Sequence, residues 1–285
     1  MLIIIGFFIV FAAVIGGYLL EGGNISVLIQ PAELIIIGGA AIGSFIIASP
    51  TKTIKAVIQA LLGLLRSKTY GKKDYLEALL LLNGIFYKIR QQGLVAIESD
   101  VDDPEKSSLF NRFPGILKNR RAMAVIADTL RMVMTTTIAT HELEALLENE
   151  IDTHYEELIA PSKTVSFIAD GLPGLGIVAA VLGVVLTMGK IGAPPEILGH
   201  SIGAALVGTF LGVLLAYGFV GPVGRHMEHA VHEELEYLNV FKVALVAFVG
   251  GAAPKVALEF GRRVIPHDIK PDFAEVEEML RQAKK

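Results

Sequence analysis

Two long apolar segments, separated by a short break, constrain the fold of this chain most. Residues 172–188 read LPGLGIVAAVLGVVLTM, and residues 198–220 read LGHSIGAALVGTFLGVLLAYGFV. Each is long enough to cross a hydrocarbon core of about 30 Å. The break between them holds Pro194 and Pro195, which favour a turn. We therefore predict two membrane-spanning helices joined as a hairpin.

Small residues indicate that both helices pack closely against others. In the second segment they recur at every fourth position: Ala204, Gly208, Gly212 and Ala216. This spacing places them on one helix face, and small side chains there allow another membrane helix to approach closely. The first segment carries a similar set, namely Gly176, Ala179, Ala180 and Gly183. We expect contacts with other helices rather than with lipid alone.

The interiors of both segments lack acidic and basic side chains. No Asp, Glu, Lys, Arg or His occurs in residues 172–188 or 202–220, and the interior polar groups are Thr187, Thr209 and Tyr217. An ion path along these helices therefore has hydroxyl groups but no carboxylate of its own. If the chain moves ions, we expect the titrating acid to come from another chain.

Two further apolar segments lie near the N-terminus. Residues 1–20 are uncharged and long enough for one span, and no Lys or Arg precedes Lys52 to form the basic start of a cleaved signal peptide. Residues 34–48 form a shorter span that reaches full depth only if the turn near Pro31 is included. Since 53% of all residues are hydrophobic, we predict an all-α integral membrane protein with four transmembrane helices.

The remaining segments are polar and helical in pattern. In residues 51–165 apolar side chains recur at three- and four-residue steps, as at Met123, Ile126 and Leu130, which is typical of amphipathic helices. Residues 223–238 predict a polar helix, and residues 240–253 a separate buried one. The predicted domains are 1–48 (transmembrane helices 1 and 2), 49–170 (a large helical cytoplasmic domain), 171–221 (transmembrane helices 3 and 4) and 222–285 (cytoplasmic C-terminal helices).

The distribution of basic residues predicts the orientation. Residues 21–33 and 189–198 hold one basic residue between them, Lys190, whereas residues 49–171 and 221–285 hold the other 24. Lys and Arg near span ends stay on the cytoplasmic side of a membrane. We therefore expect the large domain and both termini to be cytoplasmic.

Several residues near span ends are candidates for a structural or a functional role. Asp170 either caps the N-terminus of the third span, where the helix dipole favours an acid, or lies at the mouth of an ion path. Glu33 is the other carboxylate near a span end. Pro173 is expected in the first turn of the third span, and Pro161 and Pro222 are expected to end helices.

Three histidines at three-residue steps are a candidate metal site. His226, His229 and His232 lie beside three glutamates, and two of the histidines could share a metal on one helix face. A solvated helix face near the membrane is the more common origin of such a pattern, so we predict no metal and no cofactor. The chain has no Cys for a thiolate site, and its net charge of −4 does not favour nucleic-acid binding.

Four separated motifs carry a resemblance to a known family. They are QPAELIIIGGAAIGSFI at residues 30–46, PGLGIVAAVLGVV at 173–185, GTFLGVLLAYGFVGP at 208–222 and VALEFGRR at 256–263. These segments and their order resemble the MotA branch of the MotA/TolQ/ExbB proton channel family, the stator proteins of the bacterial flagellar motor. Four spans with a long cytoplasmic insert favour the flagellar branch, because the TolQ and ExbB relatives typically have three spans.

The resemblance implies roles for individual residues. The arginine and glutamate that contact the rotor protein FliG fall on Arg90 and Glu98. The prolines linked to conformational coupling fall on Pro173 and Pro222. The hydroxyl near the partner's ion-carrying aspartate falls on Thr209.

The resemblance also implies which ion is used. Ala180 stands where sodium-driven stators have a threonine, which indicates a proton-driven stator. The ion path is thus expected to involve Thr209 and Ala180, with Asp170 near its mouth.

The partners follow from the same resemblance. They are a MotB-like single-span, peptidoglycan-binding subunit that supplies the acid, the rotor protein FliG, further copies of this chain (five around two partner chains) and the lipid of the bacterial inner membrane. The implied function is a non-enzymatic stator subunit that converts proton flow into torque for motility.

Two alternatives remain open from the sequence. One is an ExbB/TolQ-like energiser of an outer-membrane process. The other is a membrane enzyme that uses the cluster from His226 to His232.

Overall fold

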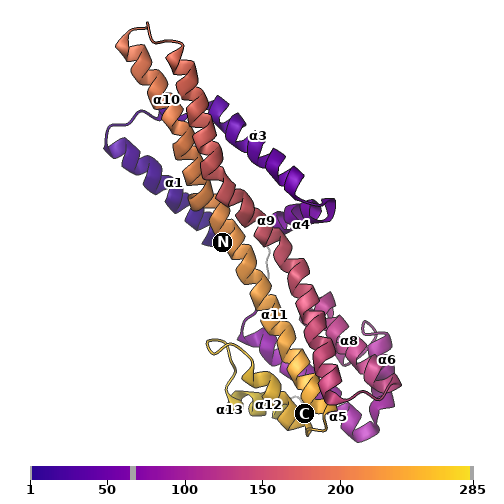
Figure 1. Cartoon of the computed structure of the whole chain (residues 1–285). Helices are drawn as coiled ribbons and strands as arrows, with labels where there is room; N and C mark the ends of the chain where they lie inside the picture. Colours follow the sequence, from indigo (N-terminus) through magenta and orange to yellow (C-terminus); the bar gives the residue numbers. More distant parts are fainter. Residues whose placement is uncertain (1, 65–68, 283–285) are drawn as a thin grey trace. The chain divides into compact units, whose positions relative to one another are not determined.

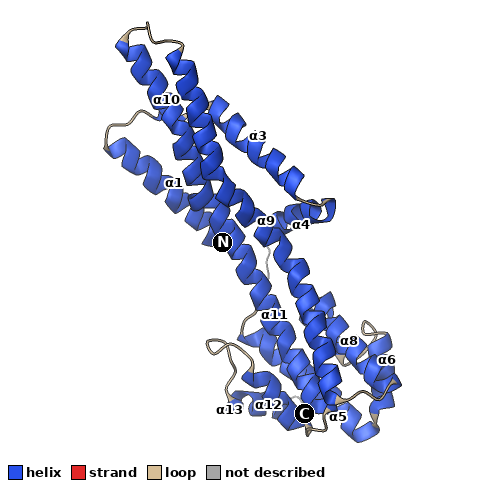
Figure 2. Ribbon diagram, in the orientation of Figure 1, coloured by secondary structure: helices blue, strands red, loops and turns tan. Residues whose placement is uncertain are grey.

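The architecture is entirely helical in the ranges that the structure, a computed structural model, describes: residues 2–64 and 69–282 (Figure 2). Within these ranges four helical segments are long and apolar enough to cross a membrane: Leu2–Leu20, Ile25–Ala48, Thr140–Met188 and Pro195–Val249. The predicted all-α fold with four transmembrane helices is therefore confirmed. Residues 1, 65–68 and 283–285 of the predicted domain ranges lie outside the described part of the chain.

The chain divides into two compact units. The membrane unit comprises Met1–Ser67 and Leu158–His229, and the polar unit comprises Lys68–Glu157 and Ala230–Lys285. These limits follow contacts within the chain and not a membrane boundary. The domain limits given above therefore stay predictions.

The membrane unit begins with two antiparallel apolar helices and an amphipathic one. The apolar helices are α1 (Leu2–Leu20) and α3 (Pro31–Ala48), and the amphipathic helix is α4 (Thr51–Gly63) (Figure 1). The short α2 (Ile25–Leu28) lies between α1 and α3 in the chain. Pro31 occupies the first turn of α3, where the missing N–H of proline has no intrahelical partner to lose. The helix of the second span thus includes the turn at Pro31, which the apolar residues 34–48 need in order to reach full membrane depth.

The helix that contains the third span begins far before the predicted span. Helix α9 (Thr140–Met188) runs without a break through Pro161 and Pro173, so Pro161 ends no helix and Pro173 is not in a first turn. Both predictions are wrong, and Asp170 cannot be an N-terminal cap. An internal proline loses one backbone hydrogen bond and crowds the carbonyl four residues earlier. Tertiary packing of a long helix overrides this local preference, and Ala169 and Leu172 beside Pro173 are buried at 4% exposure each.

Pro222 does not end the helix that contains the fourth span either. Helix α10 (Pro195–Leu214) passes into a π-helical turn, η4 (Leu215–Val220), and then into α11 (Gly221–Val249). The Gly221 N–H donates to the Ala216 carbonyl, five residues earlier. A π turn widens the helix locally. We attribute the continuous helix to this widening, which makes room for the proline ring directly after the turn.

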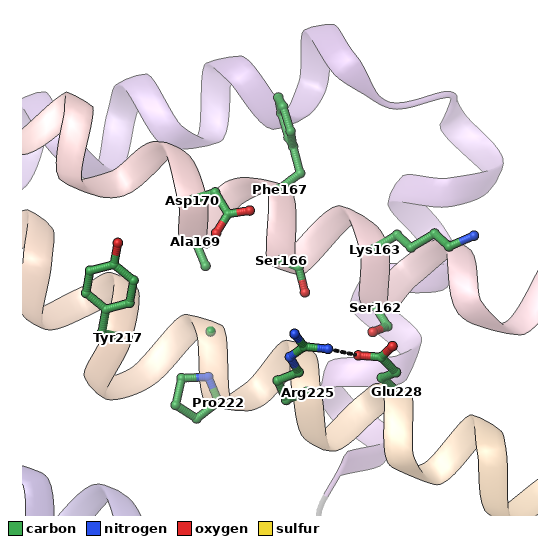
Figure 3. A pocket seen from close by; sticks show the side chains of 11 residues that line it. Ser162, Lys163, Ser166, Phe167, Ala169, Asp170, Tyr217, Pro222, Arg225 and Glu228 are labelled. Carbon is green, nitrogen blue, oxygen red and sulfur yellow. Dashed lines mark hydrogen bonds and ion pairs between the residues drawn. The ribbon is translucent and has the colours of Figure 1, made fainter.

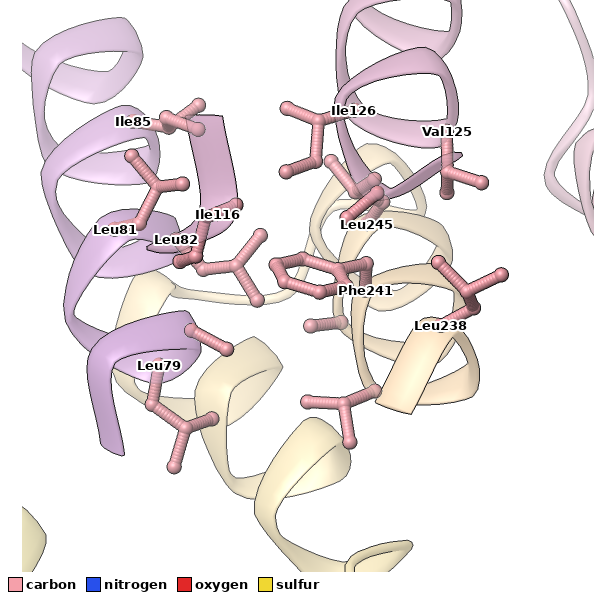
Figure 4. Packing of buried hydrophobic residues seen from close by; sticks show 14 of the residues in the cluster. Leu79, Leu81, Leu82, Ile85, Ile116, Val125, Ile126, Leu238, Phe241 and Leu245 are labelled. Atoms are coloured by element: carbon pink, nitrogen blue, oxygen red, sulfur yellow. The ribbon is translucent and has the colours of Figure 1, made fainter. Parts of the chain in front are cut away.

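The polar unit is built around one apolar core. Its helices are α5 (Lys72–Gln92), η2 (Leu94–Ile97), α6 (Glu98–Asp102), η3 (Phe110–Arg112), α7 (Pro114–Leu117), α8 (Arg120–Thr135), α12 (Pro254–Arg263), α13 (Phe273–Gln282) and parts of α9 and α11. Leu82 of α5, Ile126 of α8 and Phe241 of α11 are fully buried in this core (Figure 4). The predicted amphipathic face of residues 123–130 is confirmed.

The C-terminal prediction of two helices is wrong in one respect. Helix α11 continues to Val249 without the expected interruption, and the chain turns at Gly251, whose φ is +95°. Lys242 does not break the helix because its ammonium group pairs with Glu148. Leu238 and Leu245 on either side of it continue the buried face.

Candidate ion path, hinge pocket and rotor surface

Helices α9 and α10 are in close contact at glycine residues of both helices. A β-carbon on Gly176 would lie 2.7 Å from the Gly208 carbonyl oxygen and 3.0 Å from the Gly212 Cα. A β-carbon on Gly212 would lie 2.6 Å from the Leu172 carbonyl oxygen. Only glycine fits at such distances, so the predicted packing face is confirmed as an α9–α10 contact at Gly208 and Gly212.

Two of the predicted ion-path residues lie at this contact. The Thr209 Cα would be 3.3 Å from a β-carbon on Gly176, and the Ala180 backbone nitrogen would be 3.1 Å from one on Gly208. Thr209 is half-buried, and Ala180 is buried. The structure thus brings these two residues to one helix junction, although Asp170 lies elsewhere.

The third hydroxyl of the hairpin is already engaged. Thr187 is buried, and its Oγ1 donates a 2.9 Å hydrogen bond to the Gly183 carbonyl within α9. Such a bond to the preceding turn of the same helix satisfies a threonine without a partner chain. Thr209 has no comparable hydrogen bond among the described residues, so its hydroxyl is the better candidate for contact with water or a partner.

Sequence reasoning did not assign a site role to Glu33. The buried residues of α3 are Glu33, Ile37 and Ala41, which recur every fourth residue and therefore share one face. The carboxylate thus begins a stripe that packs inward rather than facing water. That spacing was the signal in the sequence that could have identified it.

A pocket of about 680 Å³ lies between α9 and the η4–α11 segment of the membrane unit (Figure 3). We call it the hinge pocket. Its lining residues are Ser162, Lys163, Ser166, Phe167, Ala169, Asp170, Tyr217, Gly221, Pro222, Arg225 and Glu228. Two predicted residues, Asp170 and Pro222, thus share one site, and Asp170 is exposed there.

Each helix that borders the hinge pocket contains a proline at this level. Pro222 lines the pocket directly. Pro173 does not line the pocket, but Ala169, four residues earlier in the same helix, does. Because proline has no N–H, the Ala169 carbonyl receives no helical hydrogen bond from position 173. Loss of a helical hydrogen bond lowers the resistance of a helix to bending, and prolines are common at kinks. The pocket therefore lies where both helices are locally weakened.

Close contacts fix the helices on both sides of the hinge pocket. On one side is the contact of Gly176 with Gly212. On the other, the Ser162 hydroxyl donates a 2.9 Å hydrogen bond to the Gly224 carbonyl, and a β-carbon on Gly224 would lie 2.7 Å from the Ser166 Oγ. Arg225 and Glu228 form a 2.7 Å ion pair at the rim (Figure 3). The prolines at 173 and 222 thus lie between two points at which the helices are held together.

The predicted rotor residues lie together on the polar unit. Arg90 is in the last turn of α5 and Glu98 begins α6, and both are exposed. Gly93 connects them with φ +86°, a conformation that glycine adopts without strain. Val95 between them is 75% exposed. Neither charge has an ion-pair partner within residues 2–64 and 69–282, so this turn presents two free opposite charges.

A buried network holds this turn in place. Asp100 is 6% exposed, pairs with Lys88 of α5 and accepts a 2.6 Å hydrogen bond from the Ser107 hydroxyl. The Ser107 oxygen in turn accepts the backbone N–H of Leu109 at 3.1 Å. A buried carboxylate that is both paired and hydrogen-bonded resists displacement. The positions of Arg90 and Glu98 are therefore set by the fold.

The histidine cluster gives no metal centre. The described residues contain no group of three or more His, Cys, Asp or Glu side chains that could hold a metal ion. His232 instead stacks at a tilt on Tyr155, with ring centroids 5.8 Å apart. The described residues thus give no support to the alternative of a membrane enzyme with a metal site at His226 to His232.

Comparison with known sequences agrees with this arrangement. The family model "Motility protein A N-terminal" matches residues 4–93, and the model "MotA/TolQ/ExbB proton channel family" matches residues 118–240. Motility protein A of Escherichia coli (strain K12) is 41% identical over 284 residues, which cover 100% of this chain and 96% of the relative. The chain belongs to the motility protein A family.

Other members of the motility protein A family extend this result. Chemotaxis protein LafT of Vibrio parahaemolyticus is 35% identical over 276 residues, or 97% of each chain. Motility protein A of Bacillus subtilis is 28% identical over 283 residues, which cover 99% of this chain and 97% of the relative. The prediction of a flagellar motor stator subunit is confirmed, and the family role is non-enzymatic.

Solved structures show the same fold. The structure of C. jejuni MotAB superposes with a TM-score of 0.77 at 20% identity and covers 93% of this chain and 96% of that one. The flagellar MotAB stator complex from Bacillus subtilis gives a TM-score of 0.70 at 24% identity, with 90% and 92% covered. The chain is thus a multi-pass membrane protein with the fold of these stator proteins.

Proposed function

We propose that this chain forms, with a MotB-like single-span partner, a proton channel that turns proton flow into torque on the flagellar rotor. The observation that carries the proposal is the α9–α10 junction. It is closed by glycine contacts, contains no Asp, Glu, Lys, Arg or His in residues 172–188 or 202–220, and keeps the Thr209 hydroxyl without a hydrogen bond to the described residues. A mobile proton at this junction needs a carboxylate. Helices α9 and α10 have none there, so we place the acid that carries protons past Thr209 on a partner helix, in addition to Glu33 of α3, which faces Gly208.

The driving force is sufficient for a packing change. Each proton that falls through about 100 mV releases about 2.3 kcal/mol, several times the thermal energy of about 0.6 kcal/mol. When the partner's carboxylate takes up a proton, the penalty for a charge beside the apolar wall around Ala180 disappears. The arrangement of helices that is lowest in energy therefore differs between the charged and the neutral partner.

The hinge pocket is the part of the membrane unit best suited to convert that difference into motion. Pro173 weakens α9 and Pro222 weakens the helix formed by η4 and α11, while glycine and serine contacts hold both helices on either side. Asp170 keeps a hydrophilic wall on this pocket, so water can enter and leave as its volume changes. Bending at the prolines turns the chain beyond them.

The polar unit then acts on the rotor. Arg90 and Glu98 present opposite charges on one rigid turn, which can engage complementary charges of the rotor protein FliG. Electrostatic contacts of this exposed kind form and break quickly because water and salt screen them. That property suits a surface that must engage the rotor repeatedly rather than bind it tightly.

The assembly is expected to be oligomeric and to lie in the bacterial inner membrane. Side chains of α1, such as Phe8 and Phe11, remain 72% and 57% exposed within one chain, and are suited to contact with lipid or with neighbouring copies. Five copies around two partner chains would enclose the partner helices. The basic residues of both polar segments favour cytoplasmic termini and a cytoplasmic polar unit.

The test is reconstitution of the full chain with its own single-span partner in lipid vesicles. We expect the two chains to purify together and the complex to carry protons inward under an imposed inside-negative potential. Replacing the partner's membrane aspartate with asparagine should abolish the flux without loss of complex. A partner whose outside domain binds an outer-membrane transporter instead of peptidoglycan would support the ExbB/TolQ-like alternative.

A further inference from the structure

One carboxylate lies in the interior of the membrane unit. Glu33 is 8% exposed, and its Oε2 atom is buried with no hydrogen-bond partner among the described residues. It faces two glycines on other helices. A β-carbon on Gly208 of α10 would lie 2.6 Å from Oε2, and one on Gly183 of α9 would lie 3.6 Å from Oε1. The absence of side chains at these positions leaves the space that the carboxyl group occupies.

Helix capping does not account for this placement. Glu33 is the third residue of α3, where a glutamate commonly turns back to the backbone N–H of the N-cap residue. Here the N-cap Gln30 has no side-chain capping hydrogen bond, and the Glu33 carboxyl points toward α9 and α10 instead. The side chain thus gives up the contact with which a first-turn acid usually stabilises its own helix.

An ionised carboxylate in this position is energetically unfavourable. Burial of an unpaired charge in a low-dielectric interior costs far more than burial of the neutral acid, so such groups take up a proton instead. The carboxyl group faces Gly183 and Gly208, which have no side chain to pair with it. No basic side chain pairs with Glu33 in the part of the chain that the structure describes.

We propose that Glu33 is a proton-binding site of this chain itself, in addition to the acid of the partner. The carboxyl group holds a proton while α3 packs against α9 and α10, and releases it when these helices move apart enough to admit water. Binding forms an O–H bond at one carboxyl oxygen from a hydronium ion, and release breaks that bond and leaves the carboxylate. Each change of helix packing during the motor cycle is thereby coupled to one proton at Glu33.

Infrared spectroscopy on the complex of full chain and partner in lipid vesicles tests the bound proton. We expect a C=O stretching band of a protonated carboxyl group that is lost in Glu33→Gln, an uncharged side chain of the same shape. The complex should still assemble. In the same vesicles the variant should lower proton uptake severalfold, with the amount of assembled complex unchanged.

The uptake measurement rests on the proposed proton conduction, whereas the infrared measurement does not. An unconducting wild-type complex would therefore count against the proposed function alone, and the spectrum would still decide whether Glu33 binds a proton. If the wild-type complex conducts, equal uptake by wild type and Glu33→Gln would overturn the inference. A protonated-carboxyl band that persists unchanged in Glu33→Gln would overturn it whether or not the complex conducts.

A second pair of variants keeps the proposal testable if Glu33→Gln does not assemble. Gly208→Ala places a methyl group 2.6 Å from Oε2 and must displace the carboxyl group, whereas Gly203→Ala on the same helix meets nothing within 4 Å. We expect the protonated-carboxyl band to shift in the first variant and to stay unchanged in the second. An unchanged band in Gly208→Ala would contradict the site.

Discussion

A β-carbon on Gly212 would lie 2.8 Å from the Cα of Gly176, so α9 and α10 touch backbone to backbone at this point. Because backbone atoms cannot rotate away, any side chain at 212 must push the helices apart. We expect Gly212→Ala to lower the free energy of unfolding by about 1–3 kcal/mol, as overpacked substitutions do. Gly212→Leu should prevent assembly with the partner altogether. Thermal unfolding of the purified complex and co-purification of the partner measure the two effects.

Gly199→Ala is the matched control, because a β-carbon there meets nothing within 4 Å. It should leave both measurements unchanged. Wild-type stability in Gly212→Ala would mean that the helices are further apart in the membrane than this contact indicates.

The contact between α9 and α10 could be predicted because its signal is local. Four-residue spacing of small residues reports a helix face directly, and the structure places Gly208 and Gly212 on that face against Gly176. The amphipathic helix α8 was predictable for the same reason. Length and apolarity likewise identified all four spans, since a membrane imposes both on any chain that crosses it.

The prolines show where local rules failed. Pro173 and Pro222 each lie in a continuous helix, because packing and the π turn at 215–220 outweigh the preference of proline for helix ends. Neither influence is visible in the residues next to the proline. The shared location of Asp170 and Pro222 in the hinge pocket was equally out of reach, since it depends on how α9 and α11 pair in space.

Charge reversal on the rotor surface should impair swimming. Arg90 and Glu98 are exposed ends of a turn that Asp100 fixes from inside, so Arg90→Glu or Glu98→Lys changes the surface charge without changing the fold. We expect slower swimming with normal expression and membrane assembly, and partial recovery when the facing rotor charge is reversed as well. Swimming speed and the amount of membrane-bound complex are the measurements.

Glu144→Lys, at an exposed acid of α9 in the polar unit, provides a control charge change outside the turn, and it should leave swimming unaffected. Free swimming by the double variant Arg90→Glu, Glu98→Lys with an unaltered rotor would remove both residues from the rotor interface.

The stability of the polar unit should fall in acid through Glu259. Hydrogen bonds from Arg262 and then Arg263 lower the pKa of this carboxyl from 4.5 to about 2. A lowered pKa in the folded state contributes stability above the pKa of the unfolded state, and that contribution is lost as pH falls through the folded value. Between about pH 4.5 and 2 we therefore expect a loss of about 1–2 kcal/mol, reduced by partial exposure of the pair.

Glu259→Gln should remove that pH dependence, whereas Glu105→Gln, an exposed acid on the same unit, should keep it. Unfolding of the complex, followed against pH for all three proteins, gives the comparison. A wild-type slope in Glu259→Gln would show that other carboxylates cause the loss in acid.

The orientation in the membrane can be tested with reporter fusions. Only Lys190 among the basic residues lies in the two short linkers, so we expect fusions after Glu21 and Pro195 to report outside the cytoplasm. Fusions at Lys118 and at Lys285, which lies beyond the described residues, should report inside. An outside signal at Lys118 would overturn the proposed four-span orientation.

The ion itself can be identified through Thr209. Its half-buried hydroxyl at the α9–α10 junction can hold water or accept the partner's protonated carboxyl, whereas Ala180 on the facing helix provides no second hydroxyl to replace the hydration shell of a sodium ion. We therefore expect proton drive. Swimming speed should not depend on external sodium and should collapse when a protonophore is added.

Thr209→Val, which removes the hydroxyl and little else, should slow proton-coupled swimming while the complex still assembles. The matched control is Thr187→Val, because that hydroxyl already bonds to the Gly183 carbonyl at 2.9 Å and has no free capacity to donate to an ion path. Speed that rises steeply with sodium and survives the protonophore would defeat proton drive. Equal speeds for Thr209→Val and wild type would place the path elsewhere in the membrane unit, even with the stator assignment intact.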